Sequence, residues 1–215
     1  MMKAILFDFD GTLANILPVC DMAFQHVFRK YDQRELSSAE VRAMFGPSET
    51  GIIYQNLKHR KKEEAIEQYY DQYLEHHADM IEQNRDIHSL LMHLKEKGLK
   101  LGIVTGKAKR SLDISLKALG WEHLFDAMIT GDDVVNPKPD PEGVLKILPL
   151  LGARADEAVF VGDSDADILA GTAANVVTIG VQWLPDHQTL EFAAAPSFLF
   201  KTVHDFREAM EGGFK

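Results

Sequence analysis

This chain is poor in cysteine, lacks long apolar runs and has no excess of positive charge. Cys20 is the single cysteine among 215 residues, which excludes an internal disulfide and is typical of a reducing cytosol. No apolar run reaches the roughly 18 residues of a membrane-spanning helix, and the amino terminus enters a predicted strand instead of a signal peptide. A formal net charge of −10 disfavours nucleic acid and anionic membranes as partners, because both would repel the chain. We therefore expect a cytoplasmic protein that binds neither.

The length and the apolar content of 46% suit one α/β core with an inserted subdomain. The only basic patch, residues 58–62, is followed at once by Glu63 and Glu64. We interpret it as the solvated face of a helix.

Two acids follow a short apolar run near the amino terminus. Residues 4–7 are typical of a buried strand in a parallel sheet, and Asp8 and Asp10 come directly after it. Alternation along an extended chain places both carboxylates on the same side of the backbone. Open α/β sheets bind ligands beyond the carboxyl ends of such strands. The pattern indicates a magnesium-phosphate site, although a surface Asp-Gly turn would show the same residues.

Two further segments carry groups that suit a phosphate. A second predicted strand, residues 101–104, ends at Thr105 and Gly106, which can donate hydrogen bonds to a phosphate oxygen. Thr105 could instead cap the helix that follows. Lys138 lies among three prolines, and such a rigid loop can hold a cation against a phosphate or can simply be solvated.

A last segment adds three acids after a third predicted strand, residues 158–161. Asp163, Asp165 and Asp167 are more acids than the capping of a helix requires. In this order, the four segments resemble the motifs of the haloacid dehalogenase superfamily of phosphohydrolases, and the resemblance spans residues 1–183.

The resemblance implies a role for most of the motif residues. Carried over by position, the roles are Asp8 as nucleophile, Asp10 as general acid and base, Lys138 as the neutralising cation, Thr105, Gly106 and Gly11 as substrate contacts, and Asp163 as a magnesium ligand. The metal site would also include Asp8, the main-chain carbonyl of Asp10, and Asp167 close by. Asp165 matches no family role, so we expect a solvated residue at the start of a helix. The family also implies a cis bond between Lys138 and Pro139.

The chemistry of these residues agrees with the roles. A carboxylate can attack phosphorus to form an aspartyl-phosphate, which water then hydrolyses, so that one hard step becomes two easier ones. Attack on a phosphate dianion needs Mg²⁺ and a lysine to offset the charge repulsion. Magnesium prefers oxygen ligands and keeps several waters, so neither cysteine nor histidine is required.

The organisation along the chain predicts a doubly wound parallel α/β sheet of Rossmann type with an all-helical insertion. Residues 15–84 lack apolar strand runs and show helical spacing, for example at Phe24, Val27 and Phe28. In the resembling family such an insertion is a cap that closes over the active site. The core would then comprise residues 1–14 and 85–215. Its predicted elements are a helix from Ile87 to Lys97, strands 101–104, 127–130, 158–161, 176–181 and 196–200, and helices 108–119, 142–151, 167–174 and 203–210.

The leading interpretation is a magnesium-dependent phosphatase that resembles the phosphoglycolate phosphatases and acts on a small phosphorylated metabolite. The main alternative is a sugar phosphomutase of the β-phosphoglucomutase type, which grips a second phosphate with a basic residue in a turn of the cap. Glu49 stands in the corresponding turn here, and its carboxylate should repel such a phosphate.

Other functions stay open at this point. Pyrophosphate, phosphoglycolate, sugar phosphates and nucleoside monophosphates are all candidate substrates, and the chain could be a monomer or a homodimer. A catalytically inactive binding module or a phospho-acceptor receiver domain is the non-enzyme alternative. The complete set of motif residues argues against the first, and the large helical insertion argues against the second.

Overall fold

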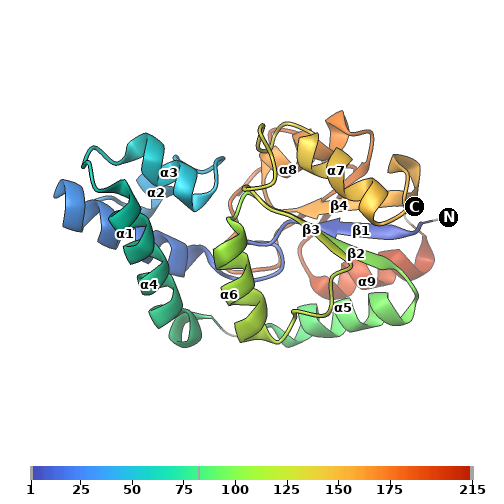
Figure 1. Cartoon of the computed structure of the whole chain (residues 1–215). Coiled ribbons are helices and arrows are strands. Elements are labelled where there is room, and N and C mark those ends of the chain that lie inside the picture. The colour runs from blue at the N-terminus through green and yellow to red at the C-terminus, as the bar shows by residue number, and fades with distance from the viewer. Residues whose placement is uncertain (1, 82, 214–215) are drawn as a thin grey trace.

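The fold is built on one parallel sheet. The structure is a computed structural model that describes residues 2–81 and 83–213. Within those residues six strands pair side by side in the order β3-β2-β1-β4-β5-β6, and every neighbouring pair is parallel (Figure 1). The strands are β1 (Ala4–Phe7), β2 (Lys100–Val104), β3 (Ala127–Ile129), β4 (Ala158–Gly162), β5 (Val177–Val181) and β6 (Phe198–Phe200). This architecture confirms the predicted doubly wound α/β fold.

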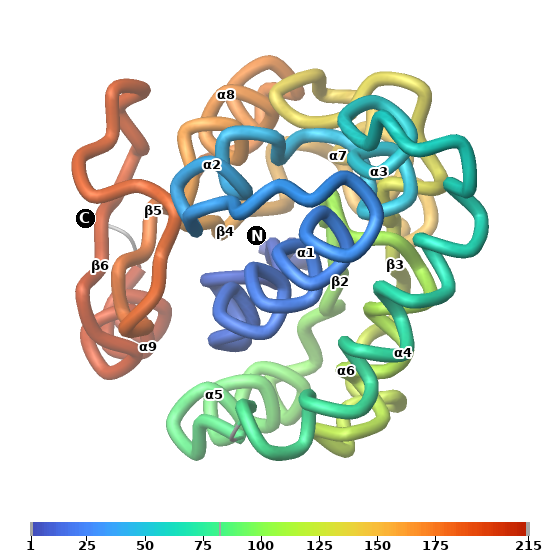
Figure 2. Tube along the Cα trace, turned by 90° about the vertical axis from the view of Figure 1, so that its left-hand side faces the viewer, coloured from blue at the N-terminus to red at the C-terminus, as the bar shows by residue number. Residues whose placement is uncertain are grey.

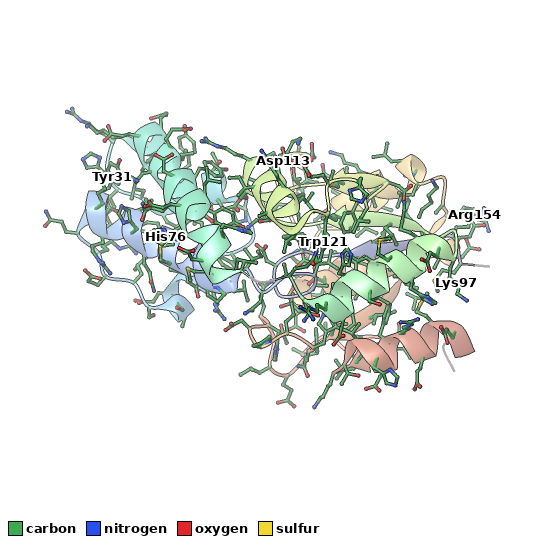
Figure 3. The ribbon with its side chains drawn as sticks, turned by 90° about the horizontal axis from the view of Figure 1, so that it is seen from below. Tyr31, His76, Lys97, Asp113, Trp121 and Arg154 are labelled. Carbon is green, nitrogen blue, oxygen red and sulfur yellow. The ribbon has the colours of Figure 1, made fainter. Side chains whose placement is uncertain are left out.

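Helices cover both faces of the sheet because its central strands are apolar on both sides. In β1, Ile5 and Phe7 join one buried cluster, while Leu6 joins the cluster on the opposite face. In Figure 1, α7 and α8 lie above the sheet and α5 and α9 lie below it. The helices of this part are α5 (Arg85–Glu96), α6 (Lys109–Leu119), α7 (Glu142–Leu150), the 3-10 helix η1 (Ala155–Glu157), α8 (Asp165–Ala173) and α9 (Val203–Gly212). Trp121, labelled in Figure 3, is fully buried after α6, and its Nε1 donates a hydrogen bond to Nδ1 of His88 at 2.9 Å.

The segment between β1 and α5 is all-helical, as predicted. It comprises α1 (Leu17–Asp32), α2 (Ser38–Arg42), α3 (Glu49–Asn56) and α4 (Lys62–Met80). Phe24 on α1 packs against Tyr69 on α4, with ring centroids 4.5 Å apart. These helices lie beyond the carboxyl ends of the strands, and Figure 2 shows α1 and α2 in front of the sheet. The segment therefore faces the edge of the sheet at which the motif residues were predicted.

Two helix starts differ by two residues from the sequence prediction. The helix predicted to begin at Asp167 begins at Asp165, because the Ser164 hydroxyl caps it by accepting a hydrogen bond from the N–H of Asp167 at 3.4 Å, while the Ser164 N–H donates to the Asp167 carboxylate at 3.0 Å. The helix predicted from Ile87 begins at Arg85, where the Asn84 side chain accepts hydrogen bonds from two backbone N–H groups. No helix in the described part of the chain combines the length and the apolarity that crossing a membrane requires.

Candidate active site

The carboxyl ends of β1 and β4 bring their acids together. Asp8 follows β1 directly, and its backbone N–H donates to the carbonyl of Val161 on β4 at 2.9 Å. Asp163 follows β4. Because neighbouring parallel strands end at the same edge of a sheet, these two side chains meet there. Both are buried, with 2% and 0% of their surface exposed.

Three buried carboxylates form a compact cluster at this edge. Asp8, Asp163 and Asp167 each offer an oxygen atom, and these three atoms all lie within 4.8 Å of one another. Burial raises the pKa of Asp8 to about 7, even though Lys138 lowers it. Burial and the two neighbouring carboxylates likewise hold the pKa of Asp163 well above its ordinary value. The cluster has more negative charge than its protein partners offset.

Lys138 provides the positive charge in this cluster. Its Nζ lies 2.7 Å from Oδ1 of Asp8 and 2.6 Å from Oδ1 of Asp167. Burial alone would lower the pKa of Lys138, but the two carboxylates raise it above its usual value, so the lysine stays protonated. The Lys138–Pro139 bond is cis, as the resemblance implied. The Glu142 carboxylate fixes the loop from the other side by accepting hydrogen bonds from two backbone N–H groups of that loop.

Asp10 turns away from the three clustered acids. Its Oδ2 lies 3.2 Å from Nζ of Lys107, while its Oδ1 is buried and has no hydrogen-bond partner among the described residues. Its carbonyl oxygen is 3.5 Å from Nε2 of Gln188. An acid with one unpaired oxygen beside a nucleophile is suited to exchanging a proton with a bound group.

A cavity of about 250 Å³ lies between these residues and the helical segment. Asp8, Asp10 and Lys138 line its floor, and the opposite wall is formed by apolar side chains of the helical segment. This volume suits a small molecule whose phosphate would lie on the floor.

Comparison with known proteins now identifies the family. A model of the haloacid dehalogenase-like hydrolases matches residues 5–181. The chain is also 33% identical over 203 residues to the pyrophosphatase PpaX of Bacillus cereus strain AH820, and the match covers 94% of each chain. The chain belongs to the haloacid dehalogenase-like hydrolase family.

Solved structures of this family have the same fold. CbbY from Rhodobacter sphaeroides, solved in complex with phosphate, has a TM-score of 0.83 at 25% identity, covering 96% of each chain. A β-phosphoglucomutase from Clostridium difficile has a TM-score of 0.82 at 22% identity, covering 98% of this chain and 96% of its own. At that identity the second likeness concerns the fold alone.

Thr105 and Gly106 line the cavity, where the family resemblance puts them. The Oγ1 of Thr105 accepts a hydrogen bond from the N–H of Lys107 at 3.2 Å, so its proton stays available for a substrate oxygen. Thr105 is not the cap of the following helix, whose N-cap residue is Ala108.

Gly11 has a different place from the one predicted. Its N–H donates to the carbonyl of Ala14 at 3.0 Å and is therefore engaged within the loop. Gly11 has a φ of +83°, and a Cβ at this position would lie 2.2 Å from Oδ2 of Asp163. The geometry thus supports a packing role for Gly11 behind Asp163 and does not support a substrate contact.

Glu49 is not the free turn residue that the sequence suggested. It is the first residue of α3, only 5% exposed, and its carboxylate accepts hydrogen bonds from the N–H of Ala108 and the hydroxyl of Ser111, both at 2.5 Å. Its Oε1 also lies 3.3 Å from Nζ of Lys107. The sequence predicted a carboxylate in this turn but not its partners, because the sequence pattern did not place the donors of α6 beside α3.

Asp165 is the first residue of α8, as expected, but it is less solvated than predicted, and no role was predicted for Lys107. Asp165 is half-buried, and its Oδ1 accepts a hydrogen bond from the N–H of Ala194 at 2.8 Å, so it holds a returning loop. The Lys107 side chain is fully buried, lies between Asp10 and Glu49, and has its Nζ 4.6 Å from the ring centroid of Tyr73. The only signal available in the sequence was a lysine directly after Thr105 and Gly106.

Proposed function

We propose that this chain is a magnesium-dependent phosphatase that hydrolyses a small phosphomonoester through an aspartyl-phosphate on Asp8. The observation that carries the proposal is the Asp8–Lys138 pair, 2.7 Å apart, in a cluster of buried carboxylates at the floor of the cavity. A buried carboxylate held by a lysine, with further acids around it, suits nucleophilic attack on a phosphate and little else.

Asp8 and Asp10 have different roles in the two steps of the reaction. An oxygen of Asp8 attacks phosphorus and forms the carboxyl–phosphate bond, while the bond to the leaving oxygen breaks and Asp10 gives that oxygen its proton. Asp10 then takes a proton from water, whose oxygen attacks phosphorus, and the bond to Asp8 breaks to release phosphate. The partnerless Oδ1 of Asp10 supports this exchange.

Lys138 stabilises the charge that develops during both steps. Its Nζ is already 2.7 Å from Asp8, so it needs little rearrangement to contact the oxygens of a phosphoryl group bound there. Its hold on Asp167 fixes the ammonium from the opposite side.

The donor set fits a hard divalent cation such as Mg²⁺. Three buried carboxylates share one lysine, which leaves negative charge uncompensated, and all the available ligands are oxygen atoms. Asp8, Asp163 and Asp167 would hold the ion, and the family resemblance adds the main-chain carbonyl of Asp10 as a ligand. Bound there, Mg²⁺ would reduce the repulsion between the phosphate and the carboxylates.

We also propose that residues 15–84 act as a cap on a core formed by residues 1–14 and 85–215. The apolar side chains of the segment form the wall of the cavity opposite Asp8, which supports a role in excluding water from the site.

The pyrophosphatase relative gives a second candidate reaction for the same groups. Pyrophosphate could be attacked by Asp8 in the same way, with phosphate as the leaving group. A panel of phosphomonoesters and pyrophosphate, assayed with Mg²⁺ and with a chelator, compares the two reactions.

Trapping tests the proposed mechanism directly. Beryllium fluoride mimics a phosphoryl group and should form an adduct on Asp8 that ¹⁹F NMR detects when Mg²⁺ is present. The Asp8→Asn variant should form none. An adduct that persists in this variant, or activity that survives chelation of the metal, would contradict the proposal.

A further inference from the structure

The start of α6 is the part of the cavity where a second anionic group of a substrate could bind. Gly106 and Lys107 line the cavity there, and backbone N–H groups at the start of a helix attract anions. In this chain three successive N–H groups already have acceptors. They are Lys107, bonded to Oγ1 of Thr105 at 3.2 Å, Ala108, bonded to Glu49 at 2.5 Å, and Lys109, bonded to Asp132 at 2.8 Å.

Lys107, beside this helix start, already pairs with two carboxylates of the protein. The Nζ of Lys107 lies 3.2 Å from Asp10 and 3.3 Å from Glu49. Among the described residues that line the cavity, Lys107 and Lys138 are the only cations, and Lys138 belongs to the floor. A second anion would therefore have to displace a carboxylate of the protein from a buried ion pair, which is unfavourable.

The cavity wall formed by the helical segment offers apolar contacts. Phe24, Phe45 and Ile52 line the cavity from the helical segment, and Cys20 and Pro47 lie beside them. Phe24 and Ile52 are also buried in the apolar core of that segment, so the wall is held in place. Such a wall favours an apolar surface on the leaving group and gives no hydrogen bond to a carboxylate or phosphate.

We propose that Glu49 occupies the anion position at the start of α6, so that the cavity selects phosphomonoesters whose leaving group is uncharged and has an apolar face. Glu49 is then a specificity-determining residue, because its carboxylate fills the position that an anionic group of the substrate would otherwise occupy. This inference rests on the proposed phosphatase function.

The wild-type protein tests the substrate class first. Propyl phosphate and phosphoglycolate have leaving groups of similar size, one neutral and apolar and the other anionic. With Mg²⁺, kcat/KM should be at least about tenfold higher for propyl phosphate than for phosphoglycolate or pyrophosphate. A preference for either anionic substrate would overturn the inference and leave the phosphatase function intact. Failure to hydrolyse any ester, including p-nitrophenyl phosphate, would instead overturn the proposed function.

Variants of Glu49 test the specificity role. Glu49→Gln keeps the shape of the side chain, and Glu49→Ala vacates the position and frees the N–H of Ala108. Both should raise the kcat/KM ratio of phosphoglycolate to propyl phosphate, by about tenfold or more for the alanine variant, mainly through a lower KM for phosphoglycolate. Adding Lys107→Met to either variant should abolish the gain, because the released cation is then missing.

Glu67→Gln is the matched control. Glu67 on α4 also pairs with a cation at the start of α6, Arg110 at 2.7 Å, but the pair is exposed and does not line the cavity. Its substrate ratio should equal that of the wild type. An unchanged ratio in both folded Glu49 variants, or the same change in Glu67→Gln, would show that Glu49 only joins α3 to α6.

Discussion

Nζ of Lys138 lies 2.7 Å from Oδ1 of Asp8, although the two residues are 130 positions apart in the chain. The strand that ends before Asp8 and the proline-rich loop that carries Lys138 meet only because β1 and β2 are neighbours in the sheet and the loop returns over them. Each charge stabilises the other in this largely buried site, since little solvent is available to either of them. The pair also contacts the other acids of the site, because Lys138 pairs with Asp167 and Asp8 clusters with Asp163.

Replacing Lys138 should therefore reduce activity strongly. In Lys138→Ala the transition state loses a cation, and we expect kcat to fall by about 10², or about 3 kcal/mol. Lys61→Ala is the control, because that lysine is exposed at the start of α4 and pairs with Glu64 at 2.9 Å. Steady-state assays with saturating Mg²⁺ measure both variants. A kcat within about threefold of the wild type for Lys138→Ala would count against the assigned role.

Replacing Asp8 should abolish turnover while the fold persists. Asp8→Asn keeps the size of the side chain but removes the attacking charge, so hydrolysis should fall by several orders of magnitude. Circular dichroism and a thermal melt check that the variant is folded. Residual activity within about tenfold of the wild type would mean that another group is the nucleophile.

Much of the site could be predicted because its residues follow strands. Asp8 and Asp163 each follow a short apolar run that can be recognised in the sequence. The rule that parallel strands end at a common edge then predicts that the two acids lie close together. The lysine among prolines could be assigned only through its resemblance to a family, since nothing local shows that Lys138 reaches Asp8.

Contacts between segments that are far apart in the sequence could not be predicted. Glu49 and Lys107 belong to an inserted helix and to the start of a core helix, and their meeting depends on how α3 and α4 pack against α6. Periodicity shows which face of a helix is apolar but not which polar residue it meets across an interface. The partner of Asp165 could not be predicted for the same reason, because it lies in the loop that returns to β6.

Adding a methyl group at Gly11 should disturb the proposed metal site. In Gly11→Ala the new Cβ would lie 2.2 Å from Oδ2 of Asp163 and would push that carboxylate away. Gly98→Ala is a matched control, since Gly98 has a similar φ of +77° with no atom within 4 Å of the added Cβ. Both variants should lose about 1 kcal/mol of stability from backbone strain. Only Gly11→Ala should also need about tenfold or more Mg²⁺ for half-maximal activity. Equal Mg²⁺ requirements would show that the contact with Asp163 relaxes without consequence.

Acid should selectively remove the stabilising effect of Asp126. Partial burial opposes its ionisation, but hydrogen bonds from the N–H of Leu101 and from Lys95 and Lys100, each at 2.9 Å, lower the pKa of Asp126 from 3.8 to about 2. Because the folded pKa is the lower one, the unfolded chain takes up the proton first as the pH falls. The stabilisation is complete above about pH 4 and is lost between pH 4 and pH 2, and it is worth about 1–2 kcal/mol after solvent screening. Urea unfolding should show wild type more stable than Asp126→Asn by that amount at pH 6, with about half of the advantage left at pH 3.

Asp113, labelled in Figure 3, is exposed and pairs with Lys109 on its own helix, so Asp113→Asn should lie within about 0.5 kcal/mol of the wild type at both pH values. An Asp126→Asn difference that stays constant with pH would mean that the carboxylate has the same pKa in the folded and the unfolded chain.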